Sequence, residues 1–336
     1  MNSIILILGF LFGASLQYAY LNKYDVISAL STRENLAVVK AIAIAIGIGA
    51  IILNLAIALG LAHYHIKPFV VGGLIIGGLL FGTGMAILGY CPGTLSVSCG
   101  EGSVDAWLGV IGGVLGGLFY TVILPFIQPV LGPNLGKISL QSLVGSTTIF
   151  YVLMCIVGFI FIMVAFGLHK IDKNKDKKWI VSGIALALLN TVVFLTAVTN
   201  RPIGASTAFP YVGDSIFHFT DNNYFDKIQT PGHWEMIFLA GAFISGFVIS
   251  NIRKDFKINA LPVNWVKYKG NSVSKRLIWS FVGGFILIFG ARMAGGCTSG
   301  HILSGGMQLA FSSLFFAIFV FAGVLITGKI FYKKRI

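Results

Sequence analysis

Nine apolar stretches, each long enough to cross a lipid bilayer as a helix, follow one another along this 336-residue chain. A spanning helix needs about twenty mostly apolar residues, because its backbone must satisfy its hydrogen bonds internally. Only 10% of the residues are charged and 56% are hydrophobic, whereas soluble domains are usually about a quarter charged. The chain is therefore predicted to be an all-α polytopic membrane protein. The expected spans are 4–21, 36–61, 69–89, 104–126, 147–168, 179–198, 236–252, 277–296 and 307–329.

The basic residues are concentrated in a few connectors between these stretches. The formal net charge is +13, and most of the excess lies in segments 170–178, 253–276 and 333–335. Because cytoplasmic loops are enriched in Lys and Arg, we place these three segments in the cytoplasm and the N-terminus outside. Short basic clusters between spans indicate membrane orientation and not a nucleic-acid-binding face, so lipid and not nucleic acid is the expected surrounding.

Two stretches near opposite ends of the chain match each other. Both are glycine-rich apolar helices that stop at a cysteine inside a tight turn, GYCPGT in the first copy and GGCTSGH in the second. One ungapped shift of 206 residues aligns five glycines and a cysteine, which indicates an internal duplication. The aligned pairs are Gly77 with Gly283, Gly78 with Gly284, Gly84 with Gly290, Gly89 with Gly295, Cys91 with Cys297 and Gly100 with Gly306.

The duplication predicts three parts of the chain. Residues 1–145 form a first repeat of four spans, residues 146–176 a linker span with a basic loop, and residues 177–336 a second repeat of four spans. A single linker span inverts the second repeat, so the two cysteine turns enter the membrane from opposite sides as short re-entrant helices. Irregular backbone at that depth needs protein or water around it, so we expect a polar constriction where the turns meet.

Both turns carry groups that suit a small anion. Pro92 follows Cys91, and proline at this place favours the start of a short helix, whose free N–H groups attract negative charge. Most free cysteines are small buried hydrophobic residues, but a duplication that keeps cysteine at both turns favours a functional role. No CxxC pair or zinc-finger spacing is present, so a structural metal site is not expected. The candidate substrate-binding residues at the turns are Cys91, Thr94, Cys297, Thr298, Ser299 and His301.

Arg292 lies in an apolar helix, five residues before Cys297. A charge at this depth costs at least ~2.5 kcal/mol unless it is paired or faces water, so an arginine there is a functional candidate. The expected partners are Glu101 or Asp105 from the opposing turn, or the transported anion itself. Glu101 is therefore a further candidate binding residue, and a structural Arg292–Glu101 ion pair is the alternative interpretation.

Four motifs point to a known family. They are LFGASLQ in the first span, GYCPGT followed by GEG, RPIGASTAF in the middle, and GARMAGGCTSGH near the end. With them the chain resembles the YeeE/YedE family of bacterial inner-membrane proteins, which take up sulfur compounds, thiosulfate being the characterised substrate class. The resemblance implies a transporter without a cofactor, and not an enzyme, in which Cys91 and Cys297 pass the substrate along through thiol hydrogen bonds.

One position departs from the family pattern. Members commonly have a cysteine shortly after the LQ motif, where this chain has Asn22. Asn22 is expected to take its place on the substrate path, and other sulfur or selenium anions remain open as substrates. A membrane thiol oxidoreductase or persulfide relay through Cys91, Cys99 and Cys297 is the alternative function. A small cytoplasmic sulfur-carrier protein, docked on the basic inner loops, is a candidate partner.

Overall fold

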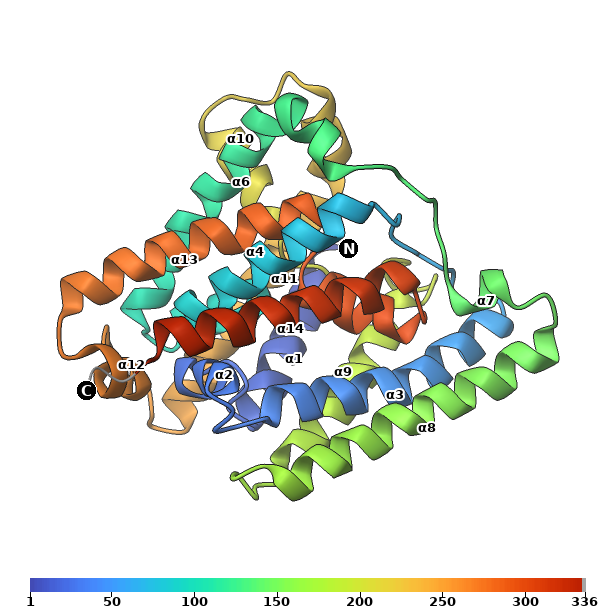
Figure 1. The fold of residues 1–336 in the computed structure, drawn as a ribbon, viewed down its shortest axis with the longest axis horizontal. Coiled ribbons are helices and arrows are strands. Elements are labelled where there is room, and N and C mark those ends of the chain that lie inside the picture. Colours follow the sequence, from blue (N-terminus) through green and yellow to red (C-terminus); the bar gives the residue numbers. More distant parts are fainter. Residues whose placement is uncertain (334–336) are drawn as a thin grey trace.

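The computed structural model describes residues 1–333, which form a bundle of helices of unequal length (Figure 1). The tail residues 334–336, which include two of the basic residues used above for orientation, lie outside the described residues. In chain order the helices are α1 (Asn2–Tyr18), α2 (Tyr24–Ser31), α3 (Ala37–Ala58), α4 (Val71–Leu88), α5 (Pro92–Gly100), α6 (Val104–Leu131), α7 (Leu140–Leu143), α8 (Thr147–Ile171), α9 (Lys178–Phe194), α10 (Ala208–Ile216), α11 (Asn223–Ile252), α12 (Val263–Lys269), α13 (Val273–Met293), the π-helical segment η1 (Thr298–Gly305) and α14 (Phe311–Phe331).

Seven helical segments in the described part of the chain are long and apolar enough to cross a membrane: α3, α4 taken with α5, α6, α8, α11, α13 and α14. Two shorter apolar helices, α1 and α9, coincide with the first and sixth expected spans. The all-α polytopic class is therefore confirmed, whereas nine complete crossings stay a prediction. Helix α11 starts well before the expected Met236, because the Asn222 side chain caps its first turn by accepting from the backbone N–H groups of Tyr224 and Phe225.

Helices α4 and α13 cross closely at glycines in the middle of the bundle. A Cβ on Gly77 would lie 2.7 Å from Gly290 O, and a Cβ on Gly290 would lie 2.7 Å from Gly77 O. In the same way, a Cβ on Gly84 would lie 2.8 Å from Gly283 O. Gly77 corresponds to Gly283 and Gly84 to Gly290 in the duplication, so each contact is the image of the other. This reciprocal pattern is typical of an interface around a two-fold axis.

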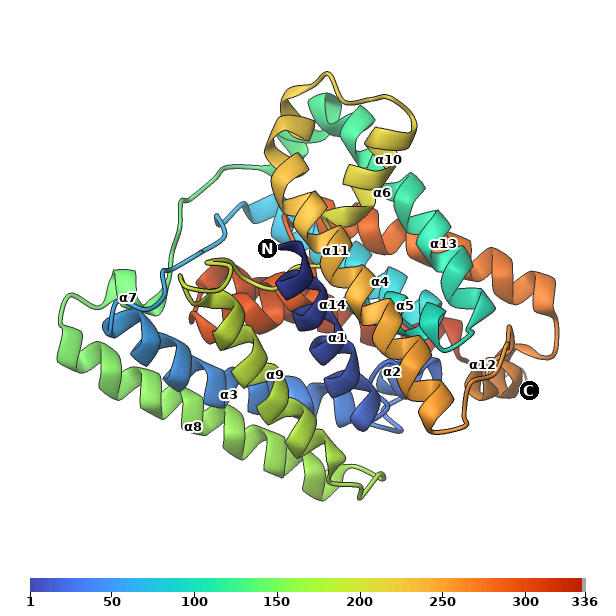
Figure 2. The same ribbon diagram turned by 180° about the vertical axis from the view of Figure 1, so that it is seen from behind.

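The flanking helices pack in matching pairs around this crossing. Helix α4 packs on α14 as α13 packs on α6, and α1 packs on α11 as α3 packs on α9 (Figures 1 and 2). If the two repeats are exchanged, the α4–α14 pair becomes the α13–α6 pair, and the α1–α11 pair becomes the α9–α3 pair. Helix α8 packs mainly on α3 and keeps most of its surface at the outside of the bundle. The pairing agrees with an inverted repeat and an odd linker helix, and the division into repeats stays a prediction.

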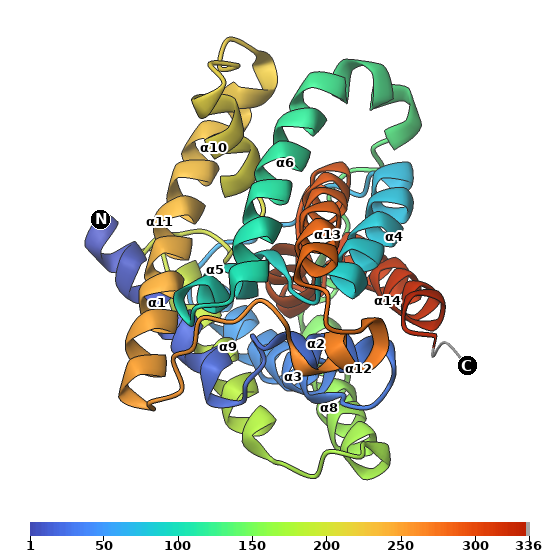
Figure 3. The ribbon, with the colours of Figure 1, turned by 90° about the vertical axis from the view of Figure 1, so that its left-hand side faces the viewer.

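The basic connectors gather on one side of the molecule. In Figure 1 the loop after α8, the loop after α11 and the end of α14 lie toward the lower left, whereas the connectors before α4 and after α10 lie toward the right and the top. Figure 3 shows the short helix α5 between α11 and α6, both of which it contacts. The arrangement agrees with the positive-inside pattern, and the absolute orientation stays a prediction.

Candidate functional site

Helix α4 ends in a tight turn that requires glycine. Gly89 has a φ of 77°, in the left-handed region, and a Cβ there would clash with the Tyr24 ring. The chain restarts as α5, with Cys91 at the N-cap. Cys91 N donates to Thr94 Oγ1 at 2.8 Å, and the Thr94 hydroxyl lies 3.0 Å from Cys91 O and 3.4 Å from Cys91 Sγ. The short helix predicted from Pro92 is confirmed, and Thr94 holds the thiol at its N-terminus.

A buried arginine anchors this turn from the basic side of the protein. Arg276 is fully buried in the first turn of α13 and donates to Ile87 O at 3.2 Å and Leu88 O at 2.7 Å, the last carbonyls of α4. Its Nη2 also lies 2.6 Å from Asp105 Oδ2, and that carboxylate accepts from the Tyr90 hydroxyl at 3.2 Å. Sequence reasoning placed Arg276 among the cytoplasmic loop charges, because its partners are distant in sequence.

The second turn repeats the design of the first. Gly295 has a φ of 76°, and Cys297 is the N-cap of η1. Cys297 O accepts from His301 N at 2.7 Å, and Cys297 Sγ lies 3.2 Å from Ser299 Oγ. The Lys67 ammonium donates to Gly295 O. Each cysteine thus lies where a helix stops and a short one begins, with a hydroxyl beside its sulfur.

His301 connects the elements on either side of the second turn. The imidazole is fully buried, with Nε2 2.8 Å from Ala294 O and Nδ1 3.0 Å from Ser313 Oγ. Both ring nitrogens are therefore satisfied within the protein. This geometry places His301 as a positioning residue between the end of α13 and the start of α14.

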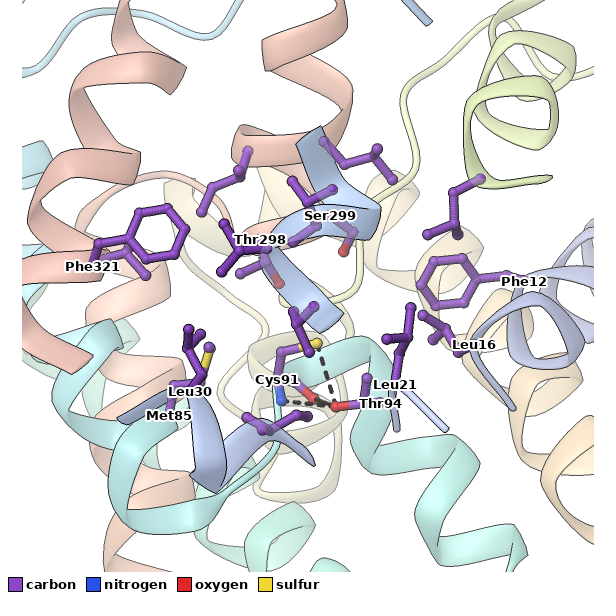
Figure 4. Close-up of a pocket in the computed structure, with 18 residues that line it drawn as sticks. Phe12, Leu16, Leu21, Leu30, Met85, Cys91, Thr94, Thr298, Ser299 and Phe321 are labelled. Carbon is purple, nitrogen blue, oxygen red and sulfur yellow. Dashed lines mark hydrogen bonds between the residues drawn. The ribbon is translucent and has the colours of Figure 1, made fainter. Parts of the chain in front are cut away.

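The two turns meet at one cavity of about 70 Å³ (Figure 4). Its polar wall consists of Cys91 and Thr94 from the first turn and Thr298 and Ser299 from the second. A cavity of this size has room for several water molecules. The rest of the wall is apolar and is formed by Phe12, Leu16, Leu21, Ile27, Leu30, Val38, Val39, Ile42, Met85, Leu186, Ile302, Leu303, Val320 and Phe321.

The four cysteines have different positions relative to this cavity. The Cys91 sulfur points toward the segment that carries Thr298 and Ser299 (Figure 4). Cys297 is fully buried and does not line the cavity. Its sulfur contacts Ser299, which is a wall residue. Cys99 is buried in the apolar core and Cys155 is exposed on α8. All four are free thiols.

Three basic side chains, Lys67, Arg201 and Arg292, lie near one another around the end of α13. In residues 1–333 none of them has a carboxylate within ion-pairing distance, and Glu235 is a carboxylate close enough to influence all three. Burial lowers the pKa of Lys67, and the charge of Arg292 lowers it further. Arg201 has a buried Nε without a hydrogen-bond partner among the described residues. We call this group the outer cation cluster; it carries more positive charge than Glu235 can balance.

The two carboxylates expected as partners of Arg292, Glu101 and Asp105, are wrong. Its Nε donates to the Tyr224 hydroxyl at 2.8 Å, and its Nη1 donates to Thr207 Oγ1 at 3.0 Å and Ser206 Oγ at 3.3 Å. Glu101 instead pairs with Lys23, and Asp105 with Arg276. The reason is that Arg292 lies in the last turn of α13, whereas Asp105 bonds to Arg276 in the first turn of that helix.

The RPIGASTAF motif, whose last two residues begin α10, reaches both turns as a mostly buried segment. Residues 203–209 are all buried. Ile203 is held to the second turn because its N–H donates to Asn190 Oδ1 at 3.4 Å and its O accepts from the Ser304 hydroxyl at 3.1 Å. A Cβ on Gly93 would lie 3.9 Å from Ala205 Cβ, so the segment also touches the first turn.

On the basic side of the cavity, α5 presents polar residues at helical spacing: Cys91, Thr94, Ser98 and Glu101. Glu101 accepts from Gln17 Nε2 and Asn22 Nδ2, both at 2.8 Å, and from Lys23 Nζ at 2.6 Å. Asn22 is fully buried, and its Oδ1 has no partner among residues 1–333. We call this group the inner polar network. Asn22 and Glu101 belong to it and are not part of the cavity wall.

The fold and the site define a class of protein. The constriction where the turns meet is mainly apolar, with four polar wall residues, and not the polar constriction expected from the sequence. A polytopic helical membrane protein with two broken helices meeting at such a cavity has the architecture of a solute transporter. The model of the family described as "Sulphur transport" matches residues 24–326, and the chain belongs to that family.

Two relatives of known name match most of the chain. The thiosulfate transporter TsuA of Spirochaeta thermophila is 26% identical over 345 residues and is covered, like this chain, over 98% of its length. The thiosulfate transporter TsuA of Escherichia coli K12 is 21% identical over 321 residues, covering 88% of this chain and 84% of the relative. This chain is therefore similar to these transporters over nearly its whole length.

Proposed function

We propose that this protein is an uptake transporter of the bacterial inner membrane for thiosulfate or a closely related sulfur anion. The observation that carries the proposal is the cavity between the Cys91 and Cys297 turns, with the outer cation cluster beside the second turn. The names of the two relatives support thiosulfate as the substrate. In this proposal the N-terminus is outside and the basic connectors are cytoplasmic, because cytoplasmic loops are enriched in Lys and Arg.

The anion first meets the outer cation cluster. Lys67, Arg201 and Arg292 all lie near the single carboxylate of Glu235, which balances one of their three charges, so an oxyanion supplies negative charge that the cluster lacks. Charged hydrogen bonds from such groups are about twice as strong as neutral ones. The cluster therefore concentrates the substrate next to the Cys297 turn.

Passage through the constriction uses weaker contacts. Among residues 1–333 the cavity wall has no charged residue, and it offers the Cys91 thiol with the hydroxyls of Thr94, Thr298 and Ser299. Thiols are weak donors, which suits a soft terminal sulfur, and a site on a transport path must release as well as bind. Cys297 contacts the wall through Ser299.

The anion then leaves along the polar face of α5. Ser98 and Asn22 follow the cavity, and the partly exposed Lys23 completes the path to the basic side.

We include in the proposal the division into an inverted first repeat (1–145), linker (146–176) and second repeat (177–336), supported by the reciprocal glycine contacts of α4 and α13. A small sulfur-carrier protein at the basic connectors is the proposed receiver of the product.

A growth experiment tests the substrate. Bacteria that lack their own uptake systems for sulfur oxyanions but can assimilate thiosulfate should grow on thiosulfate when they express this chain. Uptake of labelled sulfite, sulfate and selenite, measured one at a time, defines the specificity. No growth on thiosulfate and no uptake of the other anions, with the chain present in the membrane, would refute the proposal.

Three variants test the path. Cys91→Ala and Cys297→Ala should each abolish growth on thiosulfate, and Ser299→Ala should slow it, because the link from Cys297 to the cavity is lost. Cys155→Ala is the matched control, since Cys155 is exposed on α8 and should be dispensable. Unimpaired uptake in both cavity-side cysteine variants would remove the thiols from the mechanism.

A further inference from the structure

Asp214 is a fully buried carboxyl group on α10, next to the outer cation cluster. One of its oxygens, Oδ2, lies 2.9 Å from Thr121 Oγ1. The other, Oδ1, has no hydrogen-bond partner, and no cation in residues 1–333 lies within ion-pairing distance of the group. A buried carboxylate with a single neutral donor is costly, and the usual outcome is that the group takes up a proton.

The hydrogen bonds around Thr121 fit the neutral acid. The Thr121 hydroxyl has one proton but lies within hydrogen-bond distance of two oxygens, Asp214 Oδ2 at 2.9 Å and Gly117 O at 3.3 Å. If Asp214 is protonated on Oδ2, it donates to Thr121, and Thr121 donates to Gly117. Both contacts are then satisfied at once. Burial raises the pKa of Asp214 to about 6, against the opposing effects of Thr121 and Arg292.

The charge of Asp214 acts electrostatically on the outer cation cluster. Arg292 of α13 and Tyr224 of α11 both interact electrostatically with Asp214, and they are hydrogen-bonded to each other at 2.8 Å. Tyr120 of α6 stacks edge-on against Tyr224, and Glu235 of α11 acts on Arg292. Arg292 is the positive group in this set, so the ionised form of Asp214 offsets the charge that would attract an anion.

We propose that Asp214 is a proton-binding site coupled to anion binding at the outer cation cluster. Resting on the proposed function, the inference adds that the neutral carboxyl supports anion binding and the ionised carboxylate opposes it. When an anion neutralises the field of Arg292, one proton from the outer solution binds to a carboxylate oxygen of Asp214, and no bond of the anion breaks. Because linkage is reciprocal, protonation of Asp214 strengthens anion binding by the same factor.

Anion binding should weaken as the pH rises. The anion raises the proton affinity of Asp214, so binding is strongest below the pKa of the free protein and weakens as the pH rises through it. For a coupling of one pKa unit, the dissociation constant of thiosulfate should rise about eightfold between about pH 5 and about pH 8. Thiosulfate stays a dianion in this range, so the ligand does not titrate.

Equilibrium binding of radiolabelled thiosulfate to the purified full chain in detergent measures this. Asp214→Asn mimics the neutral acid, so its affinity should stay at the low-pH value throughout. Asp221→Asn, which removes an exposed carboxyl from the same segment, is the matched control and should keep the wild-type pH profile. Asp214→Glu keeps an acid in a changed position and should shift the midpoint.

Proton uptake gives a second readout. Thiosulfate added to the wild-type protein in weak buffer near the midpoint should raise the pH reported by an indicator dye, and Asp214→Asn should abolish the signal. The inference would be overturned by a flat wild-type pH profile of binding or by an unchanged profile in Asp214→Asn. If Asp214→Asn does not fold, an unchanged midpoint in Asp214→Glu would overturn it. Each of these results would leave the proposed function intact. Absence of thiosulfate binding at every pH would instead refute the proposed function and this inference together.

Discussion

Replacing Arg276 with methionine should release the Cys91 turn. The substitution removes both donors to Ile87 O and Leu88 O and leaves Asp105 as a buried charge without its cation. Breaking one side of a buried ion pair typically costs about 3–5 kcal/mol, and each unsatisfied carbonyl adds roughly 1–3 kcal/mol. In a chain of this length we expect the melting temperature to fall by about 5 °C or more.

The assay combines stability, uptake and thiol reactivity. Thermal unfolding of the purified protein reports the first effect and thiosulfate uptake the second. In a Cys155→Ser background, a thiol reagent should label Cys91 faster in Arg276→Met, because the turn is no longer held. Lys275→Gln is the matched control, since Lys275 is the exposed neighbour of Arg276 and should leave all three measurements unchanged.

A double variant distinguishes loss of the pair from general damage. Adding Asp105→Asn to Arg276→Met removes the uncompensated charge, so the double variant should be more stable than the sum of the single effects by about 0.5–3 kcal/mol. Arg276→Lys keeps the charge but has a single ammonium in place of the planar fork, so it should restore stability more than uptake. Strict additivity, or wild-type uptake and labelling in Arg276→Met, would refute the positioning role.

Two further predictions concern the cation cluster and the helix crossing. Lys67→Gln should raise the KM for uptake about tenfold, which corresponds to a loss of about 1.4 kcal/mol of binding free energy. Lys67→Arg should restore most of the affinity, and Lys137→Gln is the control because Lys137 is exposed. An unchanged KM in Lys67→Gln would exclude Lys67 from binding. Gly84→Val should prevent accumulation of folded protein, because its Cβ would clash with Gly283 O of α13. Gly145→Val is the control, since a Cβ on Gly145 has no atom within 4 Å. Equal accumulation of both variants would contradict the close helix crossing.

The fold class could be predicted from the sequence because lipid imposes a simple rule on it. Long apolar stretches must be helical in a membrane, and the stretches near α3, α8 and α14 follow that rule closely. The start of α11 could not be predicted, because residues 223–235 are polar and contain Pro231. Its helical state depends on the Asn222 cap and on packing against α10.

Parts of the candidate site could be predicted only where the duplication marked them. The shared register singled out Cys91 and Cys297, and both lie at the starts of short helical segments. Nothing local marked Lys67 or Arg276, which look like ordinary connector charges until tertiary contacts bring them to Gly295 O and Asp105. The partner of Arg292 was wrongly predicted because proximity of the turns was taken to mean proximity of their charges.

Position 22 shows how this chain differs from the pattern that its motifs predict. A cysteine there would offer Glu101 one weak donor, whereas the Asn22 amide gives it a 2.8 Å hydrogen bond beside those from Gln17 and Lys23. The amide therefore helps to hold the Glu101 side chain beside Lys23 on the proposed exit path. A carboxylate at this place disfavours a bound anion. In the proposed path, release at the inner side should therefore depend on Lys23 exchanging its ion pair with Glu101 for a contact with the substrate. In the proposed path the third contact is thus an exchange of ion partners, and the proposed thiol contacts are those of Cys91 and Cys297 at the two turns.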